Sequence, residues 1–401
     1  MVPKNWSATT LGAIIKDSAF GPRFSSDLYS AEGNVGTIRT TDLDNEGKIN
    51  FGTIPYANLP PGFESHYLED DDLLITRSGS CGIPCIFESQ DKPIVAGAFL
   101  IRFVLKETTD VKYIHALLKS EKLQRKIQNL SSGGVQKNLS GTNLKKLEFL
   151  LPPLPEQKKI AQILSTWDQA ITATQRLLEN SQQRKKGLVQ QLLTGKRRLP
   201  GFEGEWQKVK LASVANMSSG GTPKSSIADY YDGEIPWVSI ADMTSQGKWI
   251  DHTVKNLSEL GIENSSARIY PANTVLYAMY ASIGECSIAR IPASSSQAIL
   301  GICPREDLHF EFLYFYLSSL KEEIKLQGQQ GTQSNLNAGM VKAFRIHLPS
   351  LPEQVRISEV LSAADREIYA VNQRIVALLQ EKKALMQQLL TGKRRVQVEA
   401  A

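Results

Sequence analysis

The chain has 401 residues, with 46 basic and 41 acidic side chains that give a formal net charge of +5, and 41% of its residues are hydrophobic. This length allows two or three domains that each bury a core, and the apolar content is ordinary for a soluble protein. No apolar run is long enough to span a membrane and polar sequence follows Met1, so we expect no transmembrane helix, no signal peptide and a cytoplasmic location. The mild positive charge permits nucleic-acid binding without demonstrating it.

The first 150 residues predict a globular segment of short strands broken by Gly, Pro, Asn and Asp. A helix is expected at about 111–127, followed by the polar loop SSGGVQKNLS and a lead-in at 144–150. The candidate strands are Asn34–Thr40, Asp72–Thr76, Gly82–Glu88 and Ala98–Leu105.

Residues 151–198 predict one long helix, and residues 348–395 repeat it at a constant offset of 197 without a gap. Each copy opens with Leu-Pro-Glu-Gln, in which Pro155 suits the first helical position and Glu156 the positive end of the helix dipole. Each copy ends with Thr-Gly-Lys-Arg-Arg, where Gly195 and Gly392 suit a left-handed cap.

Apolar residues inside both copies recur with alternating spacings of four and three, which is typical of the seam of a coiled coil. A pair of ordinary amphipathic core helices is the alternative, although helices of nearly 40 residues exceed the usual globular range. The seam residues are Ile160, Leu164, Trp167, Ile171, Leu178, Leu188 and Leu192 in the first copy, and Ile357, Leu361, Ala364, Ile368, Val371, Ile375, Leu378, Leu385 and Leu389 in the second.

Connectivity predicts that the two long helices are antiparallel. A helix of about 39 residues is roughly 58 Å long, whereas a globule of about 150 residues is only roughly 40 Å across. Parallel helices would require the intervening globule to bridge their full length. Antiparallel helices instead bring both of its attachment points together, with one globule at each end of the coiled coil.

Residues 200–347 repeat the plan of the first globule loosely. Asp42 with Gly47-Lys48 returns as Asp242 with Gly247-Lys248, and Ala98 and Leu100 are matched to Ala298 and Leu300. A helix is expected again at about 310–326. The two globules differ nearly everywhere else while the helices stay close, which favours a shared scaffold with two related but different targets.

We therefore predict an α+β chain with two pseudo-symmetric globular heads separated by a long antiparallel two-helix coiled coil. The predicted domains are a first head at 1–150, a first long helix at 151–199, a second head at 200–347 and a second long helix at 348–401.

Motifs for catalysis are missing from the sequence. It contains no phosphate-binding P-loop, no H-E-x-x-H, no G-x-S-x-G and no G-x-G-x-x-G, and its five histidines are scattered. The four cysteines lack the spacing of a Cys-x-x-Cys pair, so free buried thiols are expected, with a metal site or disulfide as the alternative. These absences favour a binding protein over an enzyme.

The doubled LPxLPEQ…QQLLTGKRR stretch resembles the conserved regions of the specificity (S) subunit of type I restriction–modification systems. In the second head, SGGTPKS at Ser219 and IPWVSIADM at Ile235 look like the openings of a target recognition domain, while the first head departs from this with SAFGPRFSS at Ser18.

The resemblance implies that each head reads one half of a gapped DNA site and that the coiled coil sets the gap. It also implies that two methyltransferase subunits bring S-adenosylmethionine, and that restriction subunits bring ATP and magnesium. No cofactor and no catalysis are expected in this chain.

Candidate DNA contacts are polar, basic or aromatic residues on predicted loops of the heads. For each, a solvated loop residue is the alternative, and Asn138 and Asn335 could instead cap the short helices that follow them. Residues 196–198 and 393–395 could meet phosphates or serve as cations at the ends of helices. The candidates are Arg23, Arg39, Lys48, Arg77, Ser78, Gln136 and Lys137 in the first head, and Thr222, Lys224, Lys248, Tyr280, Ser282, Gln333 and Asn335 in the second.

A second functional hypothesis remains open from the residues alone. The modest net charge also fits a structural adaptor that holds two protein-binding heads on a coiled coil without contacting DNA. Salt-dependent affinity for duplex DNA would distinguish the two hypotheses.

Overall fold

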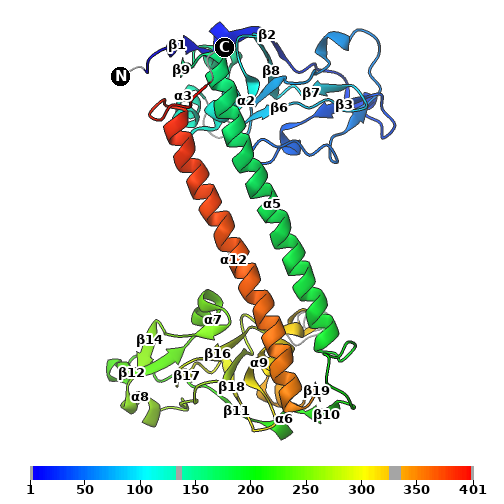
Figure 1. Cartoon of the computed structure of the whole chain (residues 1–401). Helices are drawn as coiled ribbons and strands as arrows, with labels where there is room; N and C mark the ends of the chain where they lie inside the picture. The colour runs from blue at the N-terminus through cyan, green and yellow to red at the C-terminus, as the bar shows by residue number, and fades with distance from the viewer. Residues whose placement is uncertain (1–2, 132–137, 325–335, 399–401) are drawn as a thin grey trace. The chain divides into compact units, whose positions relative to one another are not determined.

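The computed structural model describes residues 3–131, 138–324 and 336–398 (Figure 1). The chain divides into two compact units, one formed by Met1–Gln175 with Arg374–Ala401 and the other by Arg176–Gln373. Both boundaries fall within the long helices, so each unit contains one head and one segment of each helix.

The two long helices are α5, Leu154–Leu192, and α12, Leu351–Leu389, and each has 39 residues. Each helix begins one residue before its proline, so Pro155 and Pro352 are in the first turn, where a missing N–H costs nothing. Gly195 and Gly392 both have φ of +69°, which confirms the predicted left-handed caps.

Ion pairs show that α5 and α12 run antiparallel within each unit. As residue numbers rise along α5, the partners fall along α12 and its C-terminal extension. The pairs are Glu156–Arg395 and Asp168–Lys382 in the first unit, and Lys185–Asp365 and Arg198–Glu353 in the second. The predicted antiparallel arrangement is confirmed.

The seam residues of the long helices are all buried or half-buried. Ile160 and Leu361 are 0% exposed, and Leu378 is 4% exposed. Ile160 and Leu164 also join the core of the first head, and Ile357 and Leu361 join that of the second. Each head is therefore built directly onto its helix segments, and its hydrophobic core continues into them.

The first head has a two-stranded pair, a four-stranded sheet and a three-stranded sheet, in the orders β1-β9, β2-β8-β5-β6 and β4-β3-β7. One face of the four-stranded sheet packs against α2, α3, α4 and the long helices. The strands are β1 (Ser7–Thr10), β2 (Ile15–Phe20), β3 (Val35–Ile38), β4 (Tyr56–Ala57), β5 (Leu73–Thr76), β6 (Pro84–Ile86), β7 (Ile94–Ala96), β8 (Leu100–Leu105) and β9 (Glu148–Leu151), and the helices are α1 (Leu11–Ile14), α2 (Val111–Lys119), α3 (Glu121–Leu130) and α4 (Gly141–Lys145).

The single helix predicted at 111–127 is wrong in one respect, because Ser120 divides it into α2 and α3. Ser120 adopts an extended conformation with ψ of 142°. Its hydroxyl donates to the Leu117 carbonyl at 2.6 Å and accepts from the Leu123 N–H at 3.5 Å. A serine that caps the next helix in this way competes with continuation of the first.

The second head repeats the design with a two-stranded pair, a five-stranded sheet and a three-stranded sheet, in the orders β10-β19, β11-β18-β15-β16-β13 and β14-β12-β17. The strands are β10 (Gln207–Lys210), β11 (Ala215–Ser219), β12 (Tyr231–Val238), β13 (Trp249–Ile250), β14 (Lys255–Leu257), β15 (Val275–Ala278), β16 (Cys286–Ala289), β17 (Ser294–Ser295), β18 (Ile299–Pro304) and β19 (Arg345–Leu348), and the helices are α6 (Leu211–Val214), α7 (Ile240–Gln246), α8 (Glu259–Glu263), α9 (Phe310–Ser319) and α11 (Ala338–Lys342). The helix predicted at about 310–326 ends as α9 at Ser319, and its last two residues lie outside the described part.

Matching turns confirm the internal repeat and correct its register. Asp42 and Asp242 are both 2% exposed, and both accept a hydrogen bond from the backbone N–H three residues earlier. The matches of Ala98 to Ala298 and of Leu100 to Leu300 are both wrong by one residue, since the Arg77 N–H donates to Phe99 as the Met279 N–H donates to Ala298. The Leu100 N–H donates to Gly97 as the Ile299 N–H donates to Ser296, so Leu100 corresponds to Ile299.

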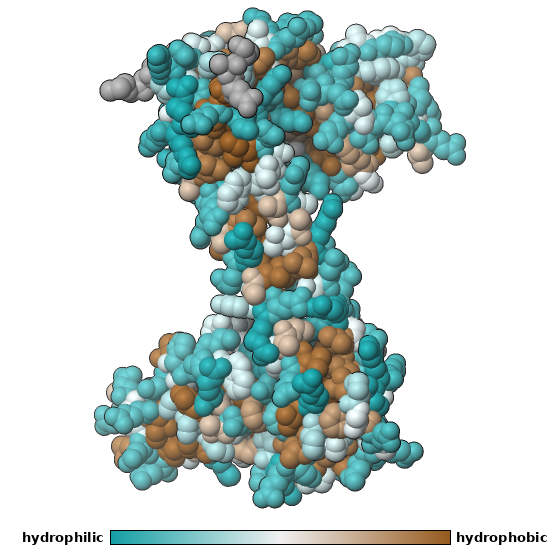
Figure 2. Space-filling view, viewed as in Figure 1, coloured by the Kyte–Doolittle hydropathy of each residue, from teal (hydrophilic) through white to brown (hydrophobic). Residues whose placement is uncertain are grey.

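On the face of each unit that Figure 2 shows, hydrophobic residues gather in patches between hydrophilic ones. No helix among the described residues is long and apolar enough to cross a membrane.

Candidate nucleic-acid interface

Ten of the fourteen candidate DNA contacts lie within the described residues, and Gln136, Lys137, Gln333 and Asn335 lie outside them. In the first head, the side chains of Arg23 and Lys48 are exposed to solvent.

Arg39 is bound to a carboxylate of its own head. Its Nη2 lies 2.8 Å from Asp42 Oδ1 and its Nε lies 3.0 Å from Asp42 Oδ2. Burial alone would raise the pKa of Asp42, but the hydrogen bonds from Arg39 and Thr53 hold it below its ordinary value. The Arg39 side chain is still 47% exposed, so it can also reach a ligand.

Arg77 and Ser78 begin the loop that follows β5, and they lie beside Asn138 and Leu139. The Leu139 N–H donates to the Arg77 carbonyl at 2.8 Å, and Ser78 forms an isolated β-bridge with Asn138. The Arg77 guanidinium carbon lies 4.6 Å from the centroid of the Phe20 ring. The structure thus brings two candidates from the β5 loop against the segment that follows Gln136 and Lys137.

Tyr280 and Ser282 occupy the matching loop of the second head, which follows β15. The Leu336 N–H donates to the Met279 carbonyl at 3.2 Å, as Leu139 does to Arg77. Tyr280 is 38% exposed. Ala281 has φ of +60° and Gly79, at the matching position, has φ of +75°. Both heads therefore use the same left-handed turn to present different side chains.

Thr222 and Lys224 are exposed beside a tightly packed turn at Gly220 and Gly221. A Cβ added to Gly221 would lie 2.2 Å from the Ala267 nitrogen, so the backbones approach too closely for any other residue. The Gly221 carbonyl accepts from Trp237 Nε1 at 2.9 Å, and Thr222 donates to Gln297. These contacts fix where Thr222 is presented.

Lys248 is held inside its own unit and does not face solvent as an open loop residue would. Its Nζ lies 2.7 Å from Glu311 Oε2 and 2.8 Å from the Ser362 hydroxyl, and 4.5 Å from the centroid of the Phe315 ring. Burial opposes ionisation of Glu311, but hydrogen bonds from Lys248 and Ser362 hold its pKa below the ordinary value. In these contacts Lys248 ties the second head to α12.

The suggestion that Asn138 caps the following short helix is wrong. Ser140 caps α4 by accepting from the Asn143 N–H at 3.0 Å, and Asn337 caps α11 by accepting from the Met340 N–H at 3.0 Å. Asn138 instead pairs with Ser78. Its matching residue Asn335 lies outside the described part of the chain.

The last arginine of each Thr-Gly-Lys-Arg-Arg ending has a role that neither sequence interpretation anticipated. Arg395 Nε and Nη2 lie 2.7 and 2.8 Å from the two carboxylate oxygens of Glu156, which also accepts from Trp6 Nε1. In the second unit Arg198 binds Glu353 in the same way, and Trp206 donates to that carboxylate. The recurrence of Trp6 as Trp206, 200 residues later, was the available sequence signal.

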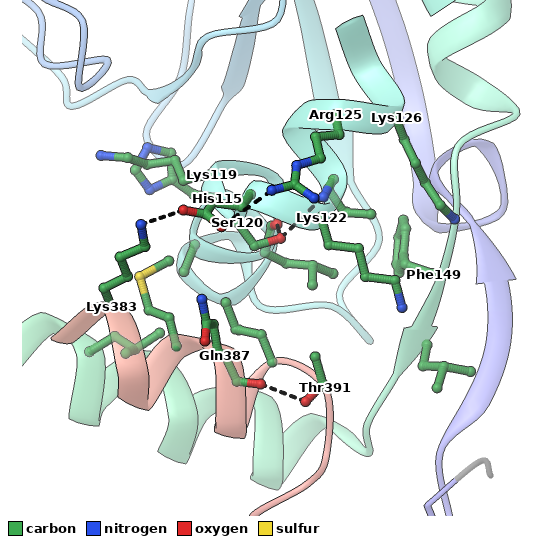
Figure 3. Close-up of a pocket in the computed structure, with 18 of the residues that line it drawn as sticks. His115, Lys119, Ser120, Lys122, Arg125, Lys126, Phe149, Lys383, Gln387 and Thr391 are labelled. Carbon is green, nitrogen blue, oxygen red and sulfur yellow. Dashed lines mark hydrogen bonds and ion pairs between the residues drawn. The ribbon is translucent and has the colours of Figure 1, made fainter. Parts of the chain in front are cut away.

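A cavity of about 860 Å³ in the first unit lies between α2, α3, β9 and the segments of α5 and α12 (Figure 3). Apolar side chains such as Leu123, Leu164 and Met386 line it. Figure 3 shows Lys122 and Lys126 extending from α3 toward Phe149. The lining has more basic than acidic side chains. The seven basic residues are Lys119, Lys122, Arg125, Lys126, Lys382, Lys383 and Lys393, and the four acidic residues are Glu46, Glu121, Glu148 and Asp168.

Metal and thiol chemistry find no support in the described residues. No group of three or more His, Cys, Asp or Glu side chains there could hold a metal ion. Cys85 and Cys286 are buried thiols, and burial raises the pKa of both, that of Cys85 to about 12. Buried thiols with so high a pKa are chemically unreactive at neutral pH.

A family model described as the type I restriction modification DNA specificity domain matches the chain twice, at residues 3–180 and 203–380. The chain belongs to this family. It is a specificity subunit with two DNA-recognition domains, and such subunits are non-catalytic components of type I systems. The predicted resemblance is confirmed.

Specificity subunits of other organisms match different lengths of this chain. The putative type I restriction enzyme MjaX specificity subunit of Methanocaldococcus jannaschii is 27% identical over 414 residues, covering 98% of this chain and 95% of the relative. The MjaIX specificity subunit of the same organism is 30% identical over 164 residues, which cover 40% of this chain and only 38% of the relative. The EcoR124I/EcoR124II specificity subunit of Escherichia coli is 26% identical over 239 residues, covering 57% of each chain.

Solved structures of specificity subunits share the fold. The S subunit from M. genitalium superposes with a TM-score of 0.60 at 18% identity, covering 97% of this chain and 99% of the other. The HsdS subunit from Thermoanaerobacter tengcongensis gives a TM-score of 0.55 at 17% identity, covering 98% of each chain.

Proposed function

We propose that this specificity subunit reads a bipartite, gapped duplex site, with one half-site per head, and carries the methyltransferase and restriction subunits of its complex. The observation that carries this proposal is the loop framework that the two heads share. The loops after β5 and β15 have the same left-handed turn and the same hydrogen bond to the returning segment, yet Arg77 stands where the other head has Met279. One framework with different side chains suits two domains that read different bases.

The exposed members of these loops are the proposed base and phosphate contacts. Hydrogen-bonding side chains on loops give direct readout in the major groove, and basic side chains contact phosphates. The proposed DNA contacts are the exposed candidates of both heads, together with Gln136, Lys137, Gln333 and Asn335. Lys248 is proposed to support the fold of its head, because Glu311 and Ser362 already bind its ammonium group.

The long helices are proposed to set the gap between the half-sites. Removing seven residues from each, at 171–177 and 368–374, preserves both the heptad pattern and the 197-residue correspondence. A loss of about 10 Å of helix corresponds to about three base pairs of duplex. The methylated motif of this variant should keep its half-sites and change only its gap, and an unchanged gap would contradict the assignment.

The cavity of the first unit is the proposed seat of one partner subunit. Its apolar lining and excess of Lys and Arg suit an acidic segment with an apolar face. Lys122 and Lys393 form no ion pair among the described residues, so both are available to such a segment. S-adenosylmethionine, ATP and magnesium are proposed to act on the partner subunits, and no cofactor site is proposed in this chain.

Methylome sequencing of a host that expresses this chain with its methyltransferase subunit tests the DNA proposal. We expect a split motif with a modified adenine in each half. Arg77→Ala should alter one half-site and Tyr280→Ala the other, so each variant is the matched control for the other. An unsplit motif, or both halves changing in both variants, would contradict the proposal. The adaptor hypothesis predicts no motif.

A further inference from the structure

Three residues at the tip of the first head's sheet lie on one face. Phe20 ends β2 and pairs with Ile101 of β8, while the Arg77 N–H, just after β5, donates to the Phe99 carbonyl at 2.9 Å. Directly opposed residues of antiparallel strands point to the same side, as do alternate residues of one strand. Phe20, Arg77 and Phe99 therefore share the face of Ile75 and Ile101.

This face changes from core to surface at its tip. Ile75 is 0% exposed and Ile101 is 2% exposed, whereas Phe20 is 48% exposed and Phe99 is 58% exposed. Apolar side chains on the same face would gain free energy by burial, so two exposed phenylalanines are unfavourable in the free head. Two exposed phenylalanines on one face are candidates for a contact surface.

Arg77 packs against one of these aromatic residues. Its guanidinium lies over the Phe20 ring, and its Nε is buried with no hydrogen-bond partner in the described part of the chain. A guanidinium held against a ring keeps its terminal N–H groups pointing in a fixed direction. That fork matches the O6 and N7 acceptors that guanine presents in the major groove.

We propose that Phe20 and Phe99 determine part of the specificity of the first head by packing against the 5-methyl group of a thymine, next to a guanine bound by Arg77. Thymine presents the apolar group of the major groove, and phenylalanine is among the residues that contact it. The inference rests on the proposed DNA-reading function and adds the chemistry of one half-site.

The second head lacks these side chains at the corresponding positions. Ser219 ends β11 as Phe20 ends β2, and the Met279 N–H donates to the Ala298 carbonyl as Arg77 does to Phe99. Met279 is only 2% exposed. The thymine contact is therefore assigned to the first head alone, and the second head provides the control.

Uracil substitution tests this contact without altering the protein, because uracil pairs as thymine does but lacks the methyl group. The assembled complex of this chain with its methyltransferase subunit is titrated with duplexes carrying its motif, in which single thymines are replaced by uracil. One thymine should bind about fourfold more weakly as uracil, as expected for burial of one methyl-sized group. Phe99→Ala and Phe20→Ala should reduce this uracil penalty to less than about twofold. Phe99→Leu should retain most of it.

Ser219→Ala, at the position of the second head that matches Phe20, should leave the penalty at this thymine intact. The inference is overturned if no thymine shows a uracil penalty while the complex binds its motif, or if the penalty survives both alanine variants. Failure of the wild-type complex to prefer any duplex would overturn the proposed function together with the inference. Circular dichroism of each variant confirms that the chain is folded.

Discussion

Replacing Glu156 by Gln should loosen the C-terminal segment from the first head. The carboxylate of Glu156 is 3% exposed and accepts from Arg395 at 2.7 and 2.8 Å and from Trp6 Nε1 at 3.1 Å. Arg395 Nη1 also donates to the Lys4 carbonyl at 2.8 Å. The group thus connects both ends of the chain to the start of α5. An amide of the same shape keeps one acceptor but turns an NH₂ group toward the donors of Arg395 and Trp6.

The expected loss of stability follows from the burial of each partner. Trp6 is 6% exposed, so an indole N–H left without an acceptor costs about 1–3 kcal/mol. Arg395 is 39% exposed and regains water when the ion pair is lost. The loss of this ion pair therefore costs only about 1 kcal/mol. Together these predict that the first unit loses about 2–4 kcal/mol of unfolding free energy. For a unit of this size the Tm should fall by about 4–16 °C.

Differential scanning calorimetry measures the loss, and hydrogen exchange locates it. Exchange should accelerate at 392–398 and around Trp6 but not around Trp206. Glu353→Gln is the matched control, because it removes the same contacts from Arg198 and Trp206 in the second unit. A Tm within about 1 °C of wild type, or equal exchange in both units, would refute the assigned role.

Three further predictions follow from individual contacts. Lys248→Met should cost about 2 kcal/mol, because it leaves the half-buried Glu311 without its cation, and adding Glu311→Gln should recover part of the loss, measured by urea unfolding. Burial lowers the pKa of His115 to about 4, so the first unit should lose stability as pH falls from about 6.5 toward 4. Unfolding measured at several pH values in this range should show that a His115→Gln variant lacks this dependence. Gly79→Ala should destabilise its left-handed turn by about 1 kcal/mol, whereas Ala281→Gly should leave the second unit equally or more stable in thermal melts; the reverse order would contradict the shared turn.

The two heads show how one scaffold can support two recognition surfaces. Their shared features are backbone features, such as the buried caps at Asp42 and Asp242 and the paired left-handed turns. Their differences are in the side chains that these turns present, as Arg77 and Met279 illustrate. Exchange of surface side chains on a fixed backbone lets a head change its target with little change in its core.

The sequence determined the long helices and their pairing. Their ends carry local signals, proline and glutamate at one end and glycine at the other, and their seam is periodic over nearly 40 residues. Repetition at a constant offset added the second copy, and the connectivity set the antiparallel direction. The doubled motif also placed the chain in its family. All of these features depend on residues close in sequence or on regular spacing.

Only the tertiary structure decided which polar side chains face solvent and which bind within the chain. Lys248 and Arg39 are residue types expected at DNA-contacting loops, yet their side chains bind Glu311 and Asp42. Glu311 lies 63 residues from Lys248 in the sequence. Arg395 meets Glu156 across 239 residues of sequence. Phe20, Arg77 and Phe99 gather only because three strands end side by side. Pairings between distant residues depend on how the chain closes in space, and neither composition nor periodicity records that.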